Sequence, residues 1–296
     1  PFHGVRLWEL PPNGQGIAAL EMLRILEDYD LAAMGHNSAA YLHHLIEAKK
    51  LAYADLDRYI GDPADMRIQP ERLLDDDFIR ARRALIDPRR AADRPDPGAA
   101  ITASETIYLT TADSAGNMVS FINSTYWEFG SGVVVPGTGF ALQNRGAGFS
   151  LEPDLPNTVA PRKLPFHTII PAFVTRTNRP TGTSDDVSGE EPWLAFGVMG
   201  GSMQPQGHVQ VLLNLLIFDM GLQQAVDAPR FRHLNGRTIA LEAPIPEDVR
   251  TALAAMGHEL TDEARVSFGG AQAILKLPRG WAAASDPRKD GLAIGY

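Results

Sequence analysis

The sequence predicts a layered α+β fold, because helical patterns dominate its first third and strand patterns dominate the rest. Apolar residues recur at helical spacing between residues 17 and 86, whereas short β-branched and apolar runs separated by turn residues follow from residue 106. The change falls at residues 87–103, which are rich in Pro, Arg, Asp and Ala. Such a composition is typical of an exposed linker. Helices and strands separated in this way along the chain favour separate layers of helix and sheet.

Three helices are expected before the linker. A wide apolar stripe predicts a largely buried helix over residues 17–29. Ser38 is suited to cap a second helix that continues to about residue 56. A third helix is expected over residues 75–86, where the acidic first turn suits the positive end of a helix dipole.

The remainder of the chain reads mainly as strands and turns. Gly200 and Gly201 lead from a strand into a helix that ends near Gly221. Residues 176–192 are polar and rich in turn formers, which predicts a surface loop. Strands are expected at residues 106–112, 118–126, 193–198 and 271–277 and near Ile169.

The first two of these strands form a hairpin around the turn at residues 113–117. An antiparallel register centred on Ala115 places Thr106 opposite Ser124. Side chains directly opposed in this way lie about 5 Å apart at Cβ, close enough for their hydroxyls to form a hydrogen bond. A slip of one residue would separate them. The alternative is that Thr106 is only a good strand former and Ser124 is incidental.

Composition excludes several classes of protein. Of the 296 residues, 44% are hydrophobic and 21% charged, which is ordinary for a globular protein. The net charge of −9 disfavours nucleic-acid and membrane-surface partners, which require a basic face. No apolar run is long enough to span a membrane. The absence of cysteine excludes disulfides, a thiol nucleophile and thiolate-bound metal.

Two further expectations concern metal binding and location. His43 and His44 are adjacent on a helix and point in different directions, so no metal site is expected from them and Glu47. The cytoplasm is favoured over the periplasm because no signal peptide is visible, although a chain that begins at Pro1 has lost its original start.

An ordered set of motifs resembles the γ-glutamyltransferase family. The segments 106–117, 120–124 and 129–132 resemble the start of that family's small subunit. Upstream, Pro11 and Pro12 with Gly16, and the segments 53–55 and 61–63, resemble the later part of the large subunit. The resemblance covers essentially the whole chain, and it continues through the segments 142–144, 197–201, 204–206, 228–231 and 284–288, with Pro171, to the end at 295–296.

The resemblance implies a four-layer αββα sandwich of the N-terminal-nucleophile hydrolase type. It also implies a precursor that cuts itself between Glu105 and Thr106. Residues 1–105 would then be the C-terminal part of the large subunit, mostly helical and ending in the linker. Residues 106–296 would be the small subunit, joined to the large one as a heterodimer. The N-terminal half of the large subunit, with the arginine that grips the substrate α-carboxylate, is expected to lie outside this sequence.

The implied chemistry centres on Thr106. After cleavage, the free α-amino group of Thr106 would serve as the base for its own hydroxyl, since that amine has a pKa of about 7.7–8.0. The hydroxyl would attack a small-molecule amide, and water or an amine would resolve the acyl-enzyme. Ser124 matches the hydroxyl that supports the nucleophile. Gly200 and Gly201 match the oxyanion hole, although a plain strand-to-helix turn is the alternative. No cofactor is required.

Departures from the family pattern concern the residues that bind the substrate. Tyr126 stands where γ-glutamyl enzymes have an asparagine. Arg145 and Gly148 stand where γ-glutamyl enzymes have the acidic or amide side chains that hold the substrate amino group. His167 and Thr168 replace two serines of the pocket. Because a guanidinium prefers a carboxylate to an ammonium, the substrate is expected to be an amide with a nearby carboxylate or an acyl side chain. Arg145 in an ordinary salt bridge and His167 as a packing residue are the alternatives.

The sequence thus favours a self-processing amidohydrolase or acyltransferase similar to the acylase and oxamate-amidohydrolase branch of the family. Three alternatives stay open: a non-catalytic or incomplete remnant of the family, a true γ-glutamyltransferase acting on glutathione-like substrates, and an unrelated α+β domain with a fortuitous match.

Overall fold

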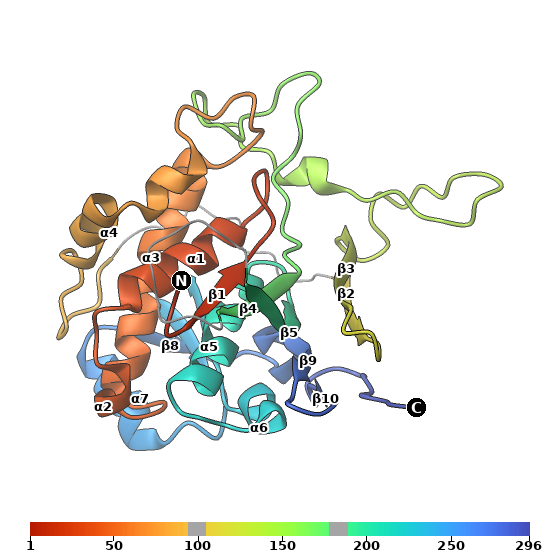
Figure 1. The fold of residues 1–296 in the computed structure, drawn as a ribbon. Helices are drawn as coiled ribbons and strands as arrows, with labels where there is room; N and C mark the ends of the chain where they lie inside the picture. Colours follow the sequence, from red (N-terminus) through yellow and green to blue (C-terminus); the bar gives the residue numbers. More distant parts are fainter. Residues whose placement is uncertain (94–104, 178–188) are drawn as a thin grey trace.

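An antiparallel sheet of five strands lies at the centre of the molecule (Figure 1). The computed structural model describes residues 1–93, 105–177 and 189–296. In spatial order the strands are β1 (Val5–Trp8), β4 (Ala172–Thr177), β5 (Glu190–Met199), β9 (Gly270–Lys276) and β10 (Trp281–Ser285). Strand β1 pairs with β4, and β5 pairs with β9, so chain segments from both ends of the protein meet in the sheet.

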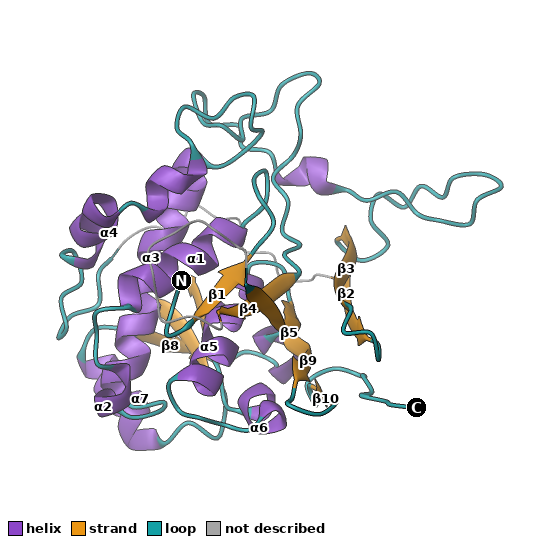
Figure 2. Ribbon diagram, viewed as in Figure 1, coloured by secondary structure: helices purple, strands orange, loops and turns teal. Residues whose placement is uncertain are grey.

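Helices cover one face of this sheet (Figure 2). The main ones are α1 (Gly16–Leu26), α3 (Ala39–Tyr59) and α5 (Met203–Leu216). Their apolar side chains share one buried core with the central strands. Around them lie α2 (Leu31–Met34), α4 (Asp76–Arg83), α6 (Leu222–Asp227), α7 (Glu247–Ala255) and the short 3-10 turns η1 (Pro70–Leu74), η2 (Arg145–Gly148) and η3 (Arg265–Phe268).

A two-stranded hairpin, β2 (Glu105–Ala112) and β3 (Met118–Tyr126), covers the other face. Strand β5 is buried on both faces. Its Phe196 and Val198 belong to the core shared with the helices, whereas Met199 packs with Tyr108 and Ile122 of the hairpin. This alternation follows from the two-residue period of a strand. The described residues therefore form a helix layer, a sheet layer and a second sheet layer.

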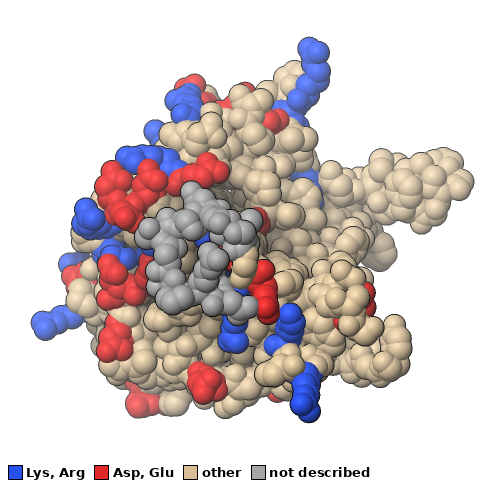
Figure 3. Space-filling view, in the orientation of Figure 1, with Lys and Arg blue, Asp and Glu red and all other residues tan. Residues whose placement is uncertain are grey.

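The outer face of the hairpin is apolar and exposed. Ile107 and Phe121 are 66% and 50% exposed. Leu109 and Val119 belong to the same face and are also exposed. Figure 3 shows acidic and basic side chains intermixed over the helical side, and a largely uncharged surface toward the hairpin at the right. Among the described helices, none combines the length and the apolar character needed to cross a bilayer.

The helix predictions were accurate within a few residues. The Ser38 hydroxyl accepts a hydrogen bond from the Tyr41 amide at 3.1 Å, so Ser38 caps α3 as expected. The predicted α+β class is confirmed. A small third sheet was not foreseen, because its strands are short and two of them carry a charged residue; it consists of β6 (Phe231–Asn235), β7 (Thr238–Leu241) and β8 (Glu259–Thr261).

Two predictions about loops were wrong at their edges. Residues 176–192 were expected to be a loop, but β4 continues to Thr177 and β5 begins at Glu190 because the two strands pair with each other. The strand expected near Ile169 begins at Ala172. The linker was expected to be exposed, yet Ala91 is buried and its amide donates to the Met256 carbonyl at 2.7 Å. Residues 94–104 and 178–188 lie outside the described part of the chain.

Candidate active site

Thr106 and Ser124 are directly opposite each other in the β2–β3 hairpin, as the turn position predicts. The Thr106 Oγ1 atom donates a hydrogen bond of 3.3 Å to Ser124 Oγ. Ser124 Oγ also accepts from the Tyr126 amide at 3.0 Å. The serine oxygen is therefore held in place by the backbone while it contacts the candidate nucleophile. The predicted contact between the two hydroxyls is present, and the roles of Thr106 and Ser124 in catalysis stay predictions.

The ladder of hydrogen bonds between the two strands is irregular between Glu105 and Thr106. On the opposite strand, Tyr126 pairs with Glu105 and has a φ of +80°. A positive φ is costly for a bulky side chain, on the order of 1–3 kcal/mol, and such strain tends to concentrate at functional sites. The irregularity thus falls on the same peptide bond that the family resemblance implies is cut.

Arg145 is a buried cation at the first position of η2 and is 1% exposed. Its Nη1 donates to Thr168 Oγ1 at 2.9 Å, and its Nη2 lies 3.5 Å from the Ser124 carbonyl oxygen. Within the described ranges, no Asp or Glu carboxylate pairs with its guanidinium. Burial lowers the pKa of Arg145 to about 10, and the nearby Tyr126 opposes this. The alternative of an ordinary salt bridge for Arg145 is therefore wrong for the described chain.

Tyr126 packs between Arg145 and Gly148. The Arg145 guanidinium lies 5.3 Å from the centre of the Tyr126 ring, a favourable cation–π distance. A Cβ atom built on Gly148 would lie 3.3 Å from the Tyr126 hydroxyl. A larger side chain at residue 148 would therefore have to displace the tyrosine. Both departures from the γ-glutamyl pattern belong to one packing arrangement around Arg145.

His167 is neutral at physiological pH. Burial, and then the charge of Arg145, lower its pKa to about 4. Its Nδ1 accepts a long hydrogen bond of 3.4 Å from the Ile169 amide. Thr168, by contrast, contacts Arg145 directly through its hydroxyl. The structure thus joins Ser124, Tyr126, Arg145 and Thr168 in one group, with His167 beside it.

Gly200 and Gly201 have φ values of +125° and +59° and connect β5 to α5. A Cβ on Gly200 would lie 3.1 Å from Met203 Cβ and 3.3 Å from Gly269 Cα, so only glycine fits there without movement. The preceding residue, Met199, packs with Tyr108 of the strand that carries Thr106. The glycine pair and the candidate nucleophile therefore adjoin the same small apolar cluster.

Several buried residues support this region through contacts that the sequence did not reveal. His208 Nε2 accepts a hydrogen bond from the Val198 amide at 3.1 Å, and its Nδ1 lies 2.7 Å from a Glu9 carboxylate oxygen. The amide of Ile170 donates to Gln204 Oε1 at 3.0 Å. Glu9 is 199 residues from its histidine, so no local pattern could have paired them. The contacts of the Gln15 side chain were missed for the same reason, since its partners are 153 and 186 residues away.

A second polar cluster lies on α3 and contains residue types that bind metals. His43, Glu47 and His258 are all buried, with their ligand atoms within 4.8 Å of one another. However, Lys50 Nζ forms a buried ion pair of 2.7 Å with Glu47. Burial, and then the positive charge of Lys50, lower the pKa of His258 to about 3. The same field would oppose a metal cation, and the prediction of no metal site stays a prediction.

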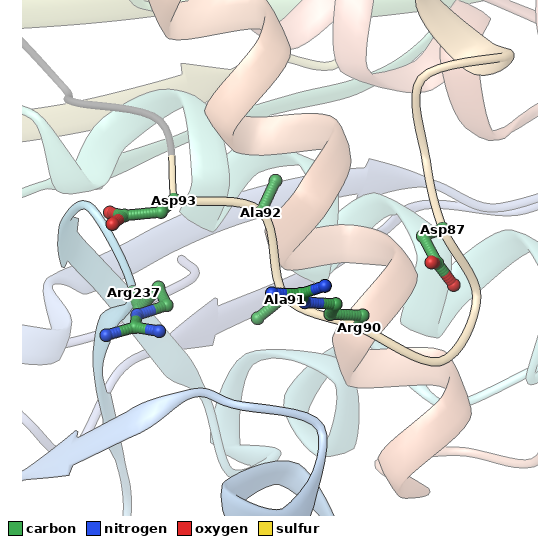
Figure 4. Close-up of a pocket in the computed structure, with 6 residues that line it drawn as sticks. All are labelled: Asp87, Arg90, Ala91, Ala92, Asp93 and Arg237. Carbon is green, nitrogen blue, oxygen red and sulfur yellow. The ribbon is translucent and has the colours of Figure 1, made fainter.

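The described part of the chain has two hollows of note. One of about 500 Å³ is lined by Ser124 with its strand neighbours Asn123 and Thr125, and by residues 140–143. Figure 4 shows the other, of about 330 Å³, between the segment after α4 and the turn that carries Arg237. Neither hollow brings together the predicted substrate-binding residues. The second is lined by Asp87, Arg90, Ala91, Ala92, Asp93 and Arg237.

The layered α+β fold is of the N-terminal-nucleophile hydrolase type, because it superposes on a cephalosporin acylase over its whole length. The family model described as gamma-glutamyltranspeptidase matches residues 1–296. This chain therefore belongs to the gamma-glutamyltranspeptidase family.

Similar proteins in this family carry the names of glutathione hydrolase-like, amidohydrolase and acylase proteins. The chain is 35% identical over 304 residues to a glutathione hydrolase-like YwrD proenzyme of Bacillus subtilis, covering 99% of this chain and 54% of that protein. It is 34% identical to the oxamate amidohydrolase proenzyme of Klebsiella pneumoniae, covering 98% of this chain and 53% of that protein. The crystal structure of cephalosporin acylase from Bacillus halodurans superposes with a TM-score of 0.86 at 42% identity, covering all of this chain and 52% of that one. The chain thus spans about half the length of these relatives.

Proposed function

We propose that this chain carries the nucleophile of a self-processing amidohydrolase or acyltransferase whose substrate bears a carboxylate near the scissile amide. The subunit boundary would lie between Glu105 and Thr106. The observation that carries the proposal is the buried Arg145 guanidinium, which has no described carboxylate partner and touches the backbone of the residue that contacts Thr106. A buried cation of this kind favours an anionic ligand.

Self-cleavage would begin with the Thr106 hydroxyl attacking the Glu105 carbonyl carbon. The peptide C–N bond breaks, the hydroxyl proton passes to the departing nitrogen, and an ester links residues 105 and 106. Water then hydrolyses the ester, leaving a carboxylate at Glu105 and a free amino group at Thr106. The irregular ladder at this bond supports the assignment, because a bond held in a regular strand is less accessible to its own side chain.

Substrate cleavage would repeat the same chemistry with an external amide. The Thr106 amino group takes the proton of the Thr106 hydroxyl, the oxygen attacks the amide carbon, and the amine leaves with that proton. Ser124 would donate a hydrogen bond to the nucleophile oxygen as negative charge develops on it. The amides of Gly200 and Gly201 would stabilise the oxyanion. Water or an acceptor amine then releases the acyl group.

The proposed carboxylate would bind between Arg145 and Thr168. Both polar groups lie on the Ser124 side of the hairpin, and Arg145 already donates to Thr168 Oγ1. The aromatic ring of Tyr126 would help to fix the position of the guanidinium through the cation–π contact. The name of one relative agrees with this substrate class, since oxamate is an amide with a carboxylate on its carbonyl carbon. A γ-glutamyl donor would instead place an ammonium near the guanidinium, which is unfavourable.

Arg145→Met tests the substrate class. We expect kcat/KM for oxamate and for a glutaryl anilide to fall by about 10²–10³-fold, because one partner of a buried charge pair is lost. Turnover of the neutral pentanoyl anilide should change far less. Arg250→Met is the matched control, since Arg250 donates only to backbone carbonyls in the described structure. Wild-type turnover of a γ-glutamyl anilide comparable to that of oxamate or glutaryl amides would overturn the proposed substrate.

A further inference from the structure

The side chain of Gln15 connects two parts of the candidate active site. Gln15 precedes α1 and is 1% exposed. Its Nε2 donates to the Gly201 carbonyl at 2.9 Å and also to the Thr168 carbonyl. These acceptors are 186 and 153 residues away along the chain. One amide nitrogen therefore bridges the glycine pair and the segment that contacts Arg145.

The orientation of this side chain is fixed by its neighbours. A primary amide nitrogen has two hydrogens, and here each one faces a carbonyl oxygen. Rotation of the amide by half a turn would place Oε1 against the same two oxygens, which is repulsive. Because the group is buried, no water can replace the lost donors without cost. The bridge has one stable arrangement.

The backbone around Gln15 strengthens the connection. The Gln15 amide donates to the His167 carbonyl at 3.2 Å, and the His167 amide donates to the Asn13 carbonyl at 2.9 Å. Residues 167–168 are therefore aligned on the segment before α1. Gly16 allows this segment to turn closely, since a Cβ there would lie 2.6 Å from Glu9 Cβ. Arg145 then binds the hydroxyl of the same Thr168 whose carbonyl Gln15 holds.

We propose that Gln15 is a positioning residue that sets the distance between the oxyanion-hole glycines and the carboxylate-binding pair Arg145 and Thr168. This inference rests on the proposed function. A substrate must place its scissile carbonyl at the glycines and its carboxylate at Arg145 simultaneously. A fixed distance between these two points selects acyl groups of one chain length. Gln15 thus determines specificity without touching the substrate.

The test uses the complete gene product and anilides of oxalic, malonic, succinic and glutaric acids. We expect the wild-type enzyme to show one clear optimum of kcat/KM in this series. Gln15→Met removes both donors while keeping the side-chain length. We expect kcat at the optimum to fall by about 10–10²-fold at a similar KM, and the chain-length profile to flatten, because misplacement is felt mainly in the transition state.

Gln210→Met is the matched control. Gln210 is also buried, and its Nε2 donates to two carbonyls, Gln206 at 2.9 Å and Phe231 at 3.2 Å. The Gln210→Met variant should lose at least as much stability as Gln15→Met and retain the wild-type dependence of kcat/KM on acyl chain length.

Gln15→Asn is a second variant, which keeps both hydrogen-bond donors on a side chain that is one methylene shorter. We expect it to shift or broaden the optimum, which a purely structural role would not do.

The outcomes separate this inference from the proposed function. If the wild-type enzyme does not prefer these anilides to the neutral butyryl anilide, the proposed substrate is wrong. If it does prefer them, and both Gln15 variants keep the wild-type kcat and chain-length optimum, the role of Gln15 is wrong. A Gln210→Met variant with the same flattened profile would also overturn it, because the effect would then follow from lost stability alone.

Discussion

At the scale of single residues, the proposed chemistry rests on the contact between Thr106 and Ser124. Ser124 Oγ accepts hydrogen bonds from the Tyr126 amide and from Thr106 Oγ1, so the serine oxygen is held directly beside the candidate nucleophile. In the described structure Thr106 is the donor of the pair. Once its oxygen carries developing negative charge, the direction of donation would reverse and Ser124 would stabilise it.

Ser124→Ala should slow both self-cleavage and amide turnover by about 10²-fold, at the lower end of the range for a group that assists proton transfer. The rate of self-cleavage can be followed by gel electrophoresis and turnover by amine release. Ser120→Ala is the control, because Ser120 lies on the same strand and bonds the Tyr108 hydroxyl at 2.6 Å. Equal losses in both variants would show that Ser124 acts only through the stability of the hairpin.

Residue-scale prediction succeeded where partners are close in sequence. The turn centre alone placed Thr106 opposite Ser124, and the register is the one expected. Glu9 and Gln15 could not be found in this way, because their partners are 153 to 199 residues away. Their segment belongs to the proline-containing motif noted in the sequence, and that motif was the available indication that residues 9–16 have a role.

At the scale of elements, a buried ionic network fastens the C-terminal strands to the rest of the molecule. Asp286 follows β10 and accepts from the Ala271 amide of β9 at 2.8 Å. It pairs with Arg230 at 2.8 Å and with Arg288 at 3.0 Å. Arg288 also pairs with Glu242, which follows β7. The motifs around residues 228–231 and 284–288 therefore supply the side chains of one buried ionic network.

Asp286→Asn should lower the free energy of unfolding at pH 7 by about 3–5 kcal/mol, because two buried guanidinium groups lose their shared carboxylate. Burial raises the pKa of Asp286, but Arg230 and Arg288 outweigh it and hold the pKa below its usual value. The stabilisation is therefore present above the ordinary aspartate pKa and is lost as pH falls through the lower folded value. The difference between wild type and variant in urea unfolding should narrow below about pH 4.

The exposed pair of Asp77 and Arg72, 3.0 Å apart, provides a control. Asp77→Asn should leave the free energy of unfolding almost unchanged, since exposed ion pairs contribute little. If Asp286→Asn is as mild as Asp77→Asn, the network does not fasten the C-terminal strands.

Elements with a strong local pattern were predictable, and elements made by tertiary contacts were not. Helix α3 could be recognised from its cap and apolar stripe. Strand β1 has four residues, and its place beside β4 depends on a partner about 170 residues away. The edges of β4 and β5 were missed for the same reason. Polar residues such as Glu190 join a strand because they pair with the adjacent strand of the sheet.

At the scale of the whole molecule, the fold presents an apolar surface that no described layer covers. The outer face of the hairpin exposes Ile107, Leu109, Val119 and Phe121, while its inner face packs on the central sheet. The chain spans about half the length of the relatives it resembles. The four-layer family fold was predicted from the resemblance, and the described residues account for the helix layer, the main sheet and a hairpin of the second sheet.

The measurement that tests the central claim most directly is the intact mass of the purified complete gene product. We expect two fragments, the second beginning at Thr106, and a single uncut chain for Thr106→Ala. Amide turnover should appear only in the cut protein, because the base is the amino group that cleavage creates. An uncut and inactive wild-type chain would support a non-catalytic remnant, and amide turnover by an uncut chain, or a cut at another bond, would contradict the role assigned to Thr106.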